Sequence, residues 1–197
     1  LGDIIIDEYL SCESLGMSRE EPVIVLKPYE KSKYLGGAGI VACHASNLGA
    51  EVDFFSVLGN DDDLTKLIKN TPIAIITLGQ IKCANIRLKL YASLKNMGAK
   101  FPTIISPHSY VSKHVILLDG TIVMHGAILN AESSIGKNCI INSQVLIGHD
   151  AVVASHCHIS TGAKVNGGAF VGTESFIGSG SVIHQSVQIG EKCMITA

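Results

Sequence analysis

The sequence lacks a strong excess of charge and any long apolar run. Its 197 residues carry a formal net charge of -2 at pH 7, so no broad basic surface exists to attract nucleic acid or an anionic membrane. No apolar run approaches the roughly 20 residues that cross a bilayer, and the start at Leu1 has no signal-peptide pattern. We therefore predict a cytoplasmic protein whose partner is a small molecule or another protein.

The sequence also lacks a disulfide framework. Its cysteines form no CxxC pair and no spacing typical of secreted domains, which fits reduced thiols; they are Cys12, Cys43, Cys83, Cys139, Cys157 and Cys193. With 47% hydrophobic and 16% charged residues, the chain is expected to fold as one ordinary domain or two small ones. Because it begins without Met and stops at Ala197, it is expected to be a fragment at both ends.

From residue 105 onward an aliphatic residue recurs every six positions, without a slip of register. This aliphatic column consists of Ile105, Val111, Leu117, Val123, Leu129, Ile135, Ile141, Ile147, Val153, Ile159, Val165, Val171, Ile177, Ile183, Ile189 and Ile195. Four positions later runs a second column of small residues or Val, from Ser109 to Cys193. Six-residue units of this kind form a short strand and a turn, and three units make a triangular coil with the aliphatic side chains inside. The repeat therefore predicts a mainly β protein with a parallel β-helix over residues 105–197, in which coils stack about 4.8 Å apart. Cys139 and Cys157, eighteen residues apart, should stack and pack as buried thiols.

Residues 63–104 have a different pattern. Ile73 to Leu78 reads as a buried strand that ends at Gly79, Asn85 to Met97 as a helix stopped by Gly98, and Phe101 to Ile105 as the next strand. This order predicts a small α/β module with a parallel pair of strands. Its helix should turn Arg87, Lys89 and Lys95 to water.

Residues 1–62 form a third segment. GDIII and PVIVL read as strands, Gly36, Gly37 and Gly39 lead into a predicted helix, and EVDFFSVLG reads as another strand. The glycine turn is interpreted either as a ligand-binding turn or as an ordinary tight turn.

The stretch from about Thr71 to the end resembles the sialic-acid and bacillosamine O- or N-acetyltransferases, a branch of the hexapeptide-repeat acyltransferases. The most specific part is NSQVLIGHDAVVASHCHISTGAKVNG, Asn142 to Gly167. The resemblance implies that the β-helix over residues 105–197 is left-handed, and that the protein transfers an acetyl group from acetyl-CoA to a sugar, as a homotrimer with the coenzyme groove between neighbouring prisms.

Gly2 to Asp62 instead resembles the opening of ribokinase-type sugar kinases, especially heptose kinases. Those kinases draw their base and anion hole from a Gly-Ala-Gly-Asp motif, which this sequence lacks. A complete kinase is therefore excluded. The join lies near Asp61 to Asp63, and a fusion, a gene remnant and a longer protein without its middle all remain open as its origin.

Acetyl transfer needs a base for the proton of the nucleophile and donors for the developing oxyanion. His149 is the predicted base, since it occupies the third position of its repeat, where side chains leave the core. By the resemblance, Asp150 holds one ring nitrogen so that the other accepts the proton.

The other site residues also come from the resemblance. It assigns His158 as donor to the acetyl carbonyl, the Gly167 N–H as an oxyanion donor, and Ser179 and Ala197 as coenzyme contacts. Asn142 matches a position near the acceptor sugar, and Gly79 matches the strand end that faces the sugar nucleotide.

Two functions other than acetyl transfer remain open as alternatives. One is a noncatalytic hexapeptide scaffold or sugar-binding remnant; the other is a trimeric zinc carbonic anhydrase. The candidate zinc ligands of a carbonic anhydrase would be His114, His125, His156 and His184. Histidines must differ by multiples of eighteen to stack on one face, and these do not. We therefore predict scattered surface histidines and no required metal.

Overall fold

The computed structural model describes residues 4–17, 24–37, 68–70, 72–81 and 83–196. They belong to two compact units, residues 2–58 and residues 59–197. Among the described residues, no helix has the length and apolar character to cross a membrane.

The first unit contains a long antiparallel hairpin. Strand β1 (Ile4–Met17) pairs with β2 (Ile24–Gly37), with register shifts between Ser11 and Cys12 and between Ser14 and Gly16. The described parts of the two predicted strands, Ile4 to Ile6 and Ile24 to Leu26, lie in β1 and β2. Gly36 and Gly37 were predicted to begin a turn. This prediction is wrong for both residues, because they form the end of β2 and pair with Ile5 and Ile4 of β1. The helix predicted after Gly39 and the strand predicted at residues 51–59 lie outside the described residues.

The second unit is dominated by two-residue strands that recur every six residues. They are β3 (Ile104–Ile105), β4 (Tyr110–Val111), β5 (Ile116–Leu117), β6 (Ile122–Val123), β7 (Ile128–Leu129), β8 (Ser134–Ile135), β9 (Ile140–Ile141), β10 (Leu146–Ile147), β11 (Val152–Val153), β12 (His158–Ile159), β13 (Lys164–Val165), β14 (Phe170–Val171), β15 (Phe176–Ile177), β16 (Val182–Ile183), β17 (Gln188–Ile189) and β18 (Met194–Ile195). Each strand pairs in parallel with the strand three places later in the chain.

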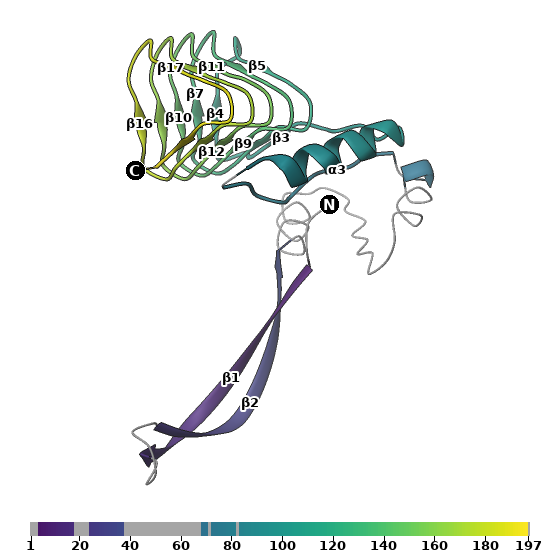
Figure 1. Ribbon diagram of the computed structural model, residues 1–197, viewed down its shortest axis with the longest axis vertical. Helices are drawn as coiled ribbons and strands as arrows, with labels where there is room; N and C mark the ends of the chain where they lie inside the picture. Colours follow the sequence, from purple (N-terminus) through teal and green to yellow (C-terminus); the bar gives the residue numbers. More distant parts are fainter. Residues whose placement is uncertain (1–3, 18–23, 38–67, 71, 82, 197) are drawn as a thin grey trace. The chain divides into compact units, whose positions relative to one another are not determined.

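These strands form the three walls of a triangular prism (Figure 1). Sheet 1 contains β3, β6, β9, β12, β15 and β18; sheet 2 contains β4, β7, β10, β13 and β16; sheet 3 contains β5, β8, β11, β14 and β17. The chain passes from sheet 1 to 2 to 3 and returns to sheet 1 one coil higher. We call the turns between them corner 1–2, corner 2–3 and corner 3–1. The predicted left-handed parallel β-helix is confirmed.

The aliphatic column fills the interior of the prism. Ile135, Ile141, Ile147, Ile159 and Ile177 are fully buried. Cys139 and Cys157 are also buried and are free thiols, as predicted. The column is more exposed at the two ends of the prism, at Ile105, Ile189 and Ile195, because a terminal coil is covered on one side only.

The corners turn through left-handed backbone. The second turn residue of most units has a positive φ, for example 58° at Asp150, 53° at Asn138 and 62° at His156. Short polar side chains tolerate this conformation better than branched ones. The repeat therefore places polar groups of successive coils above one another along each corner.

The segment before the prism contributes the helix α3 (Asn85–Asn96), close to its predicted bounds. The predicted strand Ile73 to Leu78 is wrong for most of its length, since it forms only an isolated parallel bridge between Ile73 and Lys100. Its later carbonyl oxygens, those of Ile76 and Leu78, instead accept hydrogen bonds from the Arg87 guanidinium. The strand predicted from Phe101 is likewise reduced to β3.

Arg87 was predicted to face water and is instead 1% exposed. Lys89 and Lys95 on the same helix are exposed, as predicted. The reason is helical spacing, because Arg87 shares the buried stripe of α3 with Tyr91 and Leu94,. Arg87 therefore fastens the helix to its surroundings.

Candidate active site

His149 and Asp150 form a polar pair on corner 2–3. The turn that follows β10 projects the His149 side chain into solvent, where it is 68% exposed. Its Nδ1 lies 2.6 Å from Asp150 Oδ2. An ionised carboxylate can only accept, so Nδ1 carries the hydrogen and Nε2 is left as an acceptor. The left-handed backbone at Asp150 is what turns its carboxylate back toward the preceding residue.

Gly167 lies against the other side of the His149 ring, one coil above it. A Cβ on Gly167 would lie 2.7 Å from His149 Nε2 and 2.8 Å from Cε1. The ring therefore occupies the space that any side chain at position 167 would need. The Gly167 N–H donates to no acceptor among the described residues. A basic nitrogen and an available backbone donor thus lie together at this corner.

His158 occupies an outward position on β12 in sheet 1, but it is covered. Its ring is 8% exposed and packs edge-on against Phe176, with centroids 5.2 Å apart. Its Nδ1 lies 2.6 Å from the main-chain oxygen of Gln80, which precedes α3. Burial lowers the pKa of His158 below 6.5, the Arg87 charge lowers it further, and the Gln80 hydrogen bond opposes both.

Asn142 lies beside His158, with Nδ2 3.5 Å from the His158 Nε2. Ser179 lies on corner 1–2, where its hydroxyl is 2.9 Å from that of Ser160. Gly79 is adjacent in sequence to Gln80, and a Cβ there would meet nothing within 4 Å. Ala197, the remaining predicted coenzyme contact, lies outside the described residues.

The predicted site residues therefore form two groups. His149, Asp150 and Gly167 share corner 2–3, since Gly168 N donates to His149 O one coil below. His158, Asn142 and Ser179 lie on sheet 1 and corner 1–2. No hydrogen bond between described residues joins the two groups.

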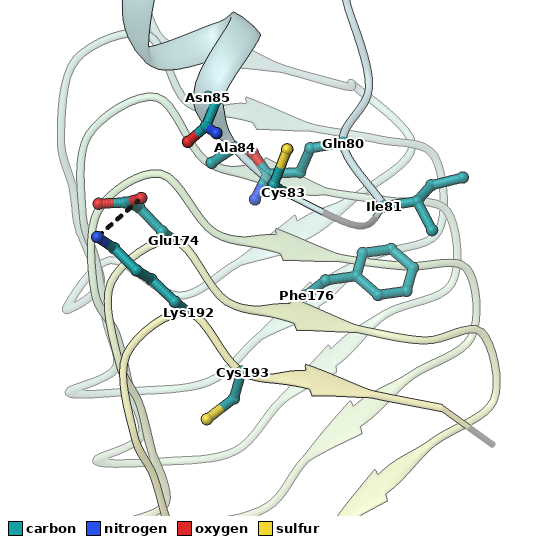
Figure 2. A pocket seen from close by; sticks show the side chains of 9 residues that line it. All are labelled: Gln80, Ile81, Cys83, Ala84, Asn85, Glu174, Phe176, Lys192 and Cys193. Atoms are coloured by element: carbon teal, nitrogen blue, oxygen red, sulfur yellow. Dashed lines mark ion pairs between the residues drawn. The ribbon is translucent and has the colours of Figure 1, made fainter.

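A small pocket of about 220 Å³ opens beside the second group (Figure 2). Its walls come from the loop before α3 and from the upper coils, and consist of Gln80, Ile81, Cys83, Ala84, Asn85, Glu174, Phe176, Lys192 and Cys193. Figure 2 shows the Lys192–Glu174 ion pair, 3.9 Å long, on one side and Ile81 and Phe176 on the other. Gln80 Oε1 is buried and has no hydrogen-bond partner within the described part of the chain. The pocket thus combines charged, apolar and unsatisfied polar groups next to Gly79.

Sequence reasoning missed four residues that support this region: Gln80, Arg87, Asn138 and His156. His156 was predicted as a scattered surface histidine, yet it is half-buried and its Nδ1 lies 3.0 Å from Asn138 Nδ2. One available signal was the placement of Arg87 on the apolar stripe of α3. No comparable signal marks Gln80, which lies 78 residues before its partner His158.

The two covered histidines predict a pH-dependent stability. Burial lowers the pKa of His156, with Arg87 adding to the effect and Glu174 opposing it, and burial also lowers that of His158. The unfolded chain then binds protons more readily, so the free energy of unfolding should fall as the pH drops below about 6.5. Denaturant unfolding at about pH 7.5 and pH 5.5 measures this.

The variant His156→Gln should reduce that pH dependence, whereas replacement of the exposed His184 by Gln should leave it unchanged. Equal pH dependence in His156→Gln and the parent would show that the buried ring does not contribute.

Within the described residues, no group of three or more His, Cys, Asp or Glu side chains is arranged to hold a metal ion. His114, His125 and His184 are exposed, and none of the four histidines considered for zinc belongs to such a group.

Comparisons with known proteins find similarity for two parts of the chain. No protein-family model matches. Over 62 residues the chain is 39% identical to the bifunctional protein HldE of Campylobacter jejuni subsp. doylei. This match covers 32% of this chain and 13% of that protein. Over 69 residues it is 41% identical to HldE of Pelobacter propionicus, covering 35% and 14%. The matches therefore span only a small part of these curated relatives, as expected from the resemblance of residues 2–62.

Most of the chain is similar in fold to solved acetyltransferase structures. The acetyltransferase domain of PglB from Neisseria gonorrhoeae superposes with a TM-score of 0.67 at 26% identity, covering 82% of this chain and 86% of that one. Its complex with acetyl coenzyme A superposes with a TM-score of 0.66, also at 26% identity, covering 80% and 87%. PerB from Caulobacter crescentus, in complex with CoA and GDP-perosamine, shares the fold with a TM-score of 0.56 at 24% identity, covering 78% and 88%.

Proposed function

We propose that this protein transfers an acetyl group from acetyl-CoA to an amino or hydroxyl group of a nucleotide-linked sugar. The observation that carries the proposal is the His149, Asp150 and Gly167 arrangement on a β-helix similar to an acetyltransferase domain that binds acetyl coenzyme A. The similar PerB structure holds CoA and GDP-perosamine, which supports a nucleotide sugar as the acceptor. Since acetyl-CoA is a cytoplasmic metabolite, the proposal retains a cytoplasmic location.

In the proposed reaction His149 acts as the general base. The amine or hydroxyl of the sugar attacks the carbonyl carbon of the thioester while its proton passes to His149 Nε2. Asp150 fixes the ring through Nδ1 and stabilises the imidazolium that forms. The tetrahedral intermediate carries its negative charge on the former carbonyl oxygen, where the Gly167 N–H can donate to it. Collapse breaks the C–S bond, and the leaving thiolate takes the proton from His149, giving CoA and the acetylated sugar.

The remaining residues are proposed to bind the two substrates. His158, Ser179 and Ala197 would contact acetyl-CoA, and Asn142 and Gly79 the sugar nucleotide. The open space around Gly79 and the unsatisfied Oε1 of Gln80, which lines the adjoining pocket, support a ligand beside this segment.

We further propose that the site is completed in a homotrimer. In one chain the base lies on corner 2–3, whereas the coenzyme contacts lie on sheet 1 and corner 1–2. In a closed ring of three prisms, one corner of each subunit can face a different corner of the next. Such a ring would bring the base of one subunit to the coenzyme of its neighbour.

The test is turnover of the full chain with acetyl-CoA and a panel of nucleotide-linked amino and hydroxy sugars. The proposal predicts an acetylated sugar by mass spectrometry, with an equimolar amount of free CoA thiol. Binding of a sugar nucleotide with no acetyl transfer to any member of the panel would favour the scaffold. Zinc-dependent hydration of carbon dioxide would favour the carbonic anhydrase.

Gly167→Ala tests the close contact with the base. Its Cβ would overlap the His149 ring, which must then move, and displacement of a catalytic group by about 1 Å can reduce turnover roughly 100-fold. We expect kcat to fall by about 10-fold to 100-fold, with the KM for acetyl-CoA little changed. Gly190→Ala is the control, because its Cβ would meet only Cys193 Sγ at an ordinary 3.6 Å. Equal kcat values for the two variants would contradict the proposed geometry.

A further inference from the structure

A buried polar network joins α3 to the coil that carries His158, and it begins at Arg87. The Arg87 Nη1 donates to the main-chain oxygens of Ile76, at 2.9 Å, and Leu78. Its Nη2 donates to the Asn138 main-chain oxygen at 3.1 Å and to Asn138 Oδ1 at 2.6 Å. Burial lowers the pKa of Arg87 to about 10, so the guanidinium remains charged at neutral pH and acts only as a donor.

The Arg87 donor fixes the orientation of the Asn138 amide. Through that amide it determines which ring nitrogen of His156 carries no hydrogen. Because Oδ1 of Asn138 accepts from Arg87, its Nδ2 is the atom 3.0 Å from His156 Nδ1. An amide nitrogen donates, so the Nδ1 of His156 must be an unprotonated acceptor. The main-chain oxygen of His156 in turn accepts from Gln80 Nε2 at 2.8 Å. The Gln80 side chain is thus tied to a coil whose local conformation is already fixed.

Gln80 determines the hydrogen position on His158. A main-chain oxygen can only accept, so the 2.6 Å contact between Gln80 O and His158 Nδ1 requires a hydrogen on Nδ1,. In the neutral ring Nε2 then has none. Gln80 is only 5% exposed. One hydrogen bond from its side chain and one to its main-chain oxygen hold the loop before α3 against the prism.

The contact of Asn142 with the opposite side of the His158 ring also indicates that Nε2 carries no hydrogen. Its Oδ1 accepts from the Ser143 N–H at 2.7 Å, which turns its Nδ2 toward His158 Nε2. At 3.5 Å this contact is too long for a strong hydrogen bond. A donor, not an acceptor, thus lies beside Nε2, as an unprotonated Nε2 requires. Because the contact is long, the Nε2 lone pair remains available to a better placed donor of a ligand.

We propose that Gln80 is a positioning residue that holds His158 in the tautomer with hydrogen on Nδ1, so that Nε2 accepts a hydrogen bond from a substrate N–H or O–H group. This inference rests on the proposed function for the identity of the substrates. It revises the role predicted for His158, because a neutral ring in this tautomer cannot donate from Nε2 to the acetyl carbonyl. The donor would be either an amide N–H of the coenzyme arm or the amine or hydroxyl of the sugar nucleotide.

Nitrogen NMR of the full chain labelled with ¹⁵N-histidine tests the tautomer without any turnover. Long-range ¹H–¹⁵N correlations distinguish protonated from unprotonated ring nitrogens, and His158→Asn identifies the His158 signals. We expect a protonated Nδ1 and an unprotonated Nε2 at neutral pH. The opposite tautomer, or an average of the two, in the parent protein would overturn the proposal even if acetyl transfer is observed.

Gln80→Met tests the positioning role, since it keeps the length of the side chain and removes the donor to His156. The His158 signals should move toward a mixture of tautomers, and the KM of the substrate that contacts Nε2 should rise about tenfold, as for one lost hydrogen bond. The control is Ile86→Met in the first turn of α3, where the side chain is 63% exposed and does not line the pocket. An unchanged His158 spectrum in folded Gln80→Met would overturn the positioning role.

Separate additions of CoA and of a nucleotide sugar distinguish the two sources of the donor. A shift of the His158 Nε2 signal with CoA alone assigns the coenzyme arm, and a shift with the nucleotide sugar alone assigns the acceptor. If neither ligand moves the signal at saturating concentration, Nε2 is not a ligand acceptor and the proposal is wrong.

Discussion

His149→Gln should lower kcat for acetyl transfer by about 10² to 10⁴, the usual contribution of a general base. Glutamine is polar and of similar length, but its side chain cannot take the proton of the attacking amine or hydroxyl. The KM for acetyl-CoA should change little, because the proposed coenzyme contacts lie on sheet 1 and corner 1–2 and not on the corner of His149. Steady-state kinetics with the preferred sugar, over about pH 6 to 9, provides the measurement.

Two variants serve as comparisons. Asp150→Asn should cost less than His149→Gln, since it weakens the orientation of the ring and leaves the base in place. Replacement of the exposed His184 by Gln should have no effect, because this residue lies one coil above the Gly167 turn and belongs to neither proposed group. If folded His149→Gln acetylates the sugar as fast as the parent at every pH, His149 is not the base.

Ile147→Asp should destabilise the β-helix by more than about 4 kcal/mol or prevent folding, because it places an unpaired charge in the prism. Ile147 is fully buried in the central coils, between Leu129 and Val165 of the same sheet. Neither neighbour offers a hydrogen-bonding side chain to a carboxylate. Denaturant unfolding followed by circular dichroism gives the change in free energy.

The matched control is Thr173→Asp, which adds the same charge on corner 3–1, where the side chain is partly exposed. It should alter the free energy of unfolding by less than about 1 kcal/mol. Similar losses of stability in the two variants would contradict the assignment of the aliphatic column to the interior.

The β-helix could be predicted from sequence because its rule is local and repeated. One aliphatic residue in every six marks the interior position of each repeat unit. The same pattern recurs in every coil, so each coil supports the assignment of its neighbours. Ile141, Ile159 and Ile177 stack on one wall because they differ by eighteen residues, one full turn of the prism. An error at one position would not have changed the prediction.

The segment before the prism was less predictable because its structure depends on one long-range side chain. The apolar run from Ile73 to Leu78 has the composition of a strand, yet the carbonyl oxygens of Ile76 and Leu78 accept hydrogen bonds from Arg87. Arg87 in turn finds two further acceptors on Asn138, 51 residues later, which help to make its burial possible. Neither hydrophobic periodicity nor helix propensity contains this information.

The candidate site divides in the same way. Adjacent residues such as His149 and Asp150 could be paired from sequence, and their contact is present. The repeat also places Gly167 one coil above His149, although its steric role emerges only from the structure. The Gln80 contact with His158 joins residues 78 apart on unrelated elements, so the tautomer of His158 could not be predicted.

We propose that the site is shared between copies of this chain, and mixed assemblies test this sharing. Chains that carry His149→Gln and chains that carry His158→Ala are coexpressed with different tags, and assemblies with both tags are purified. Each variant alone lacks one half of every site. In mixed assemblies some interfaces combine the intact His149 of one chain with the intact His158 of the next.

In every trimer that contains both kinds of chain, about one interface in three combines the two intact residues. Mixed trimers should therefore transfer acetyl groups at roughly a third of the parent rate, well above either variant alone. Mixed assemblies that are no more active than the two variants measured separately would contradict it, because the site would then lie within a single chain.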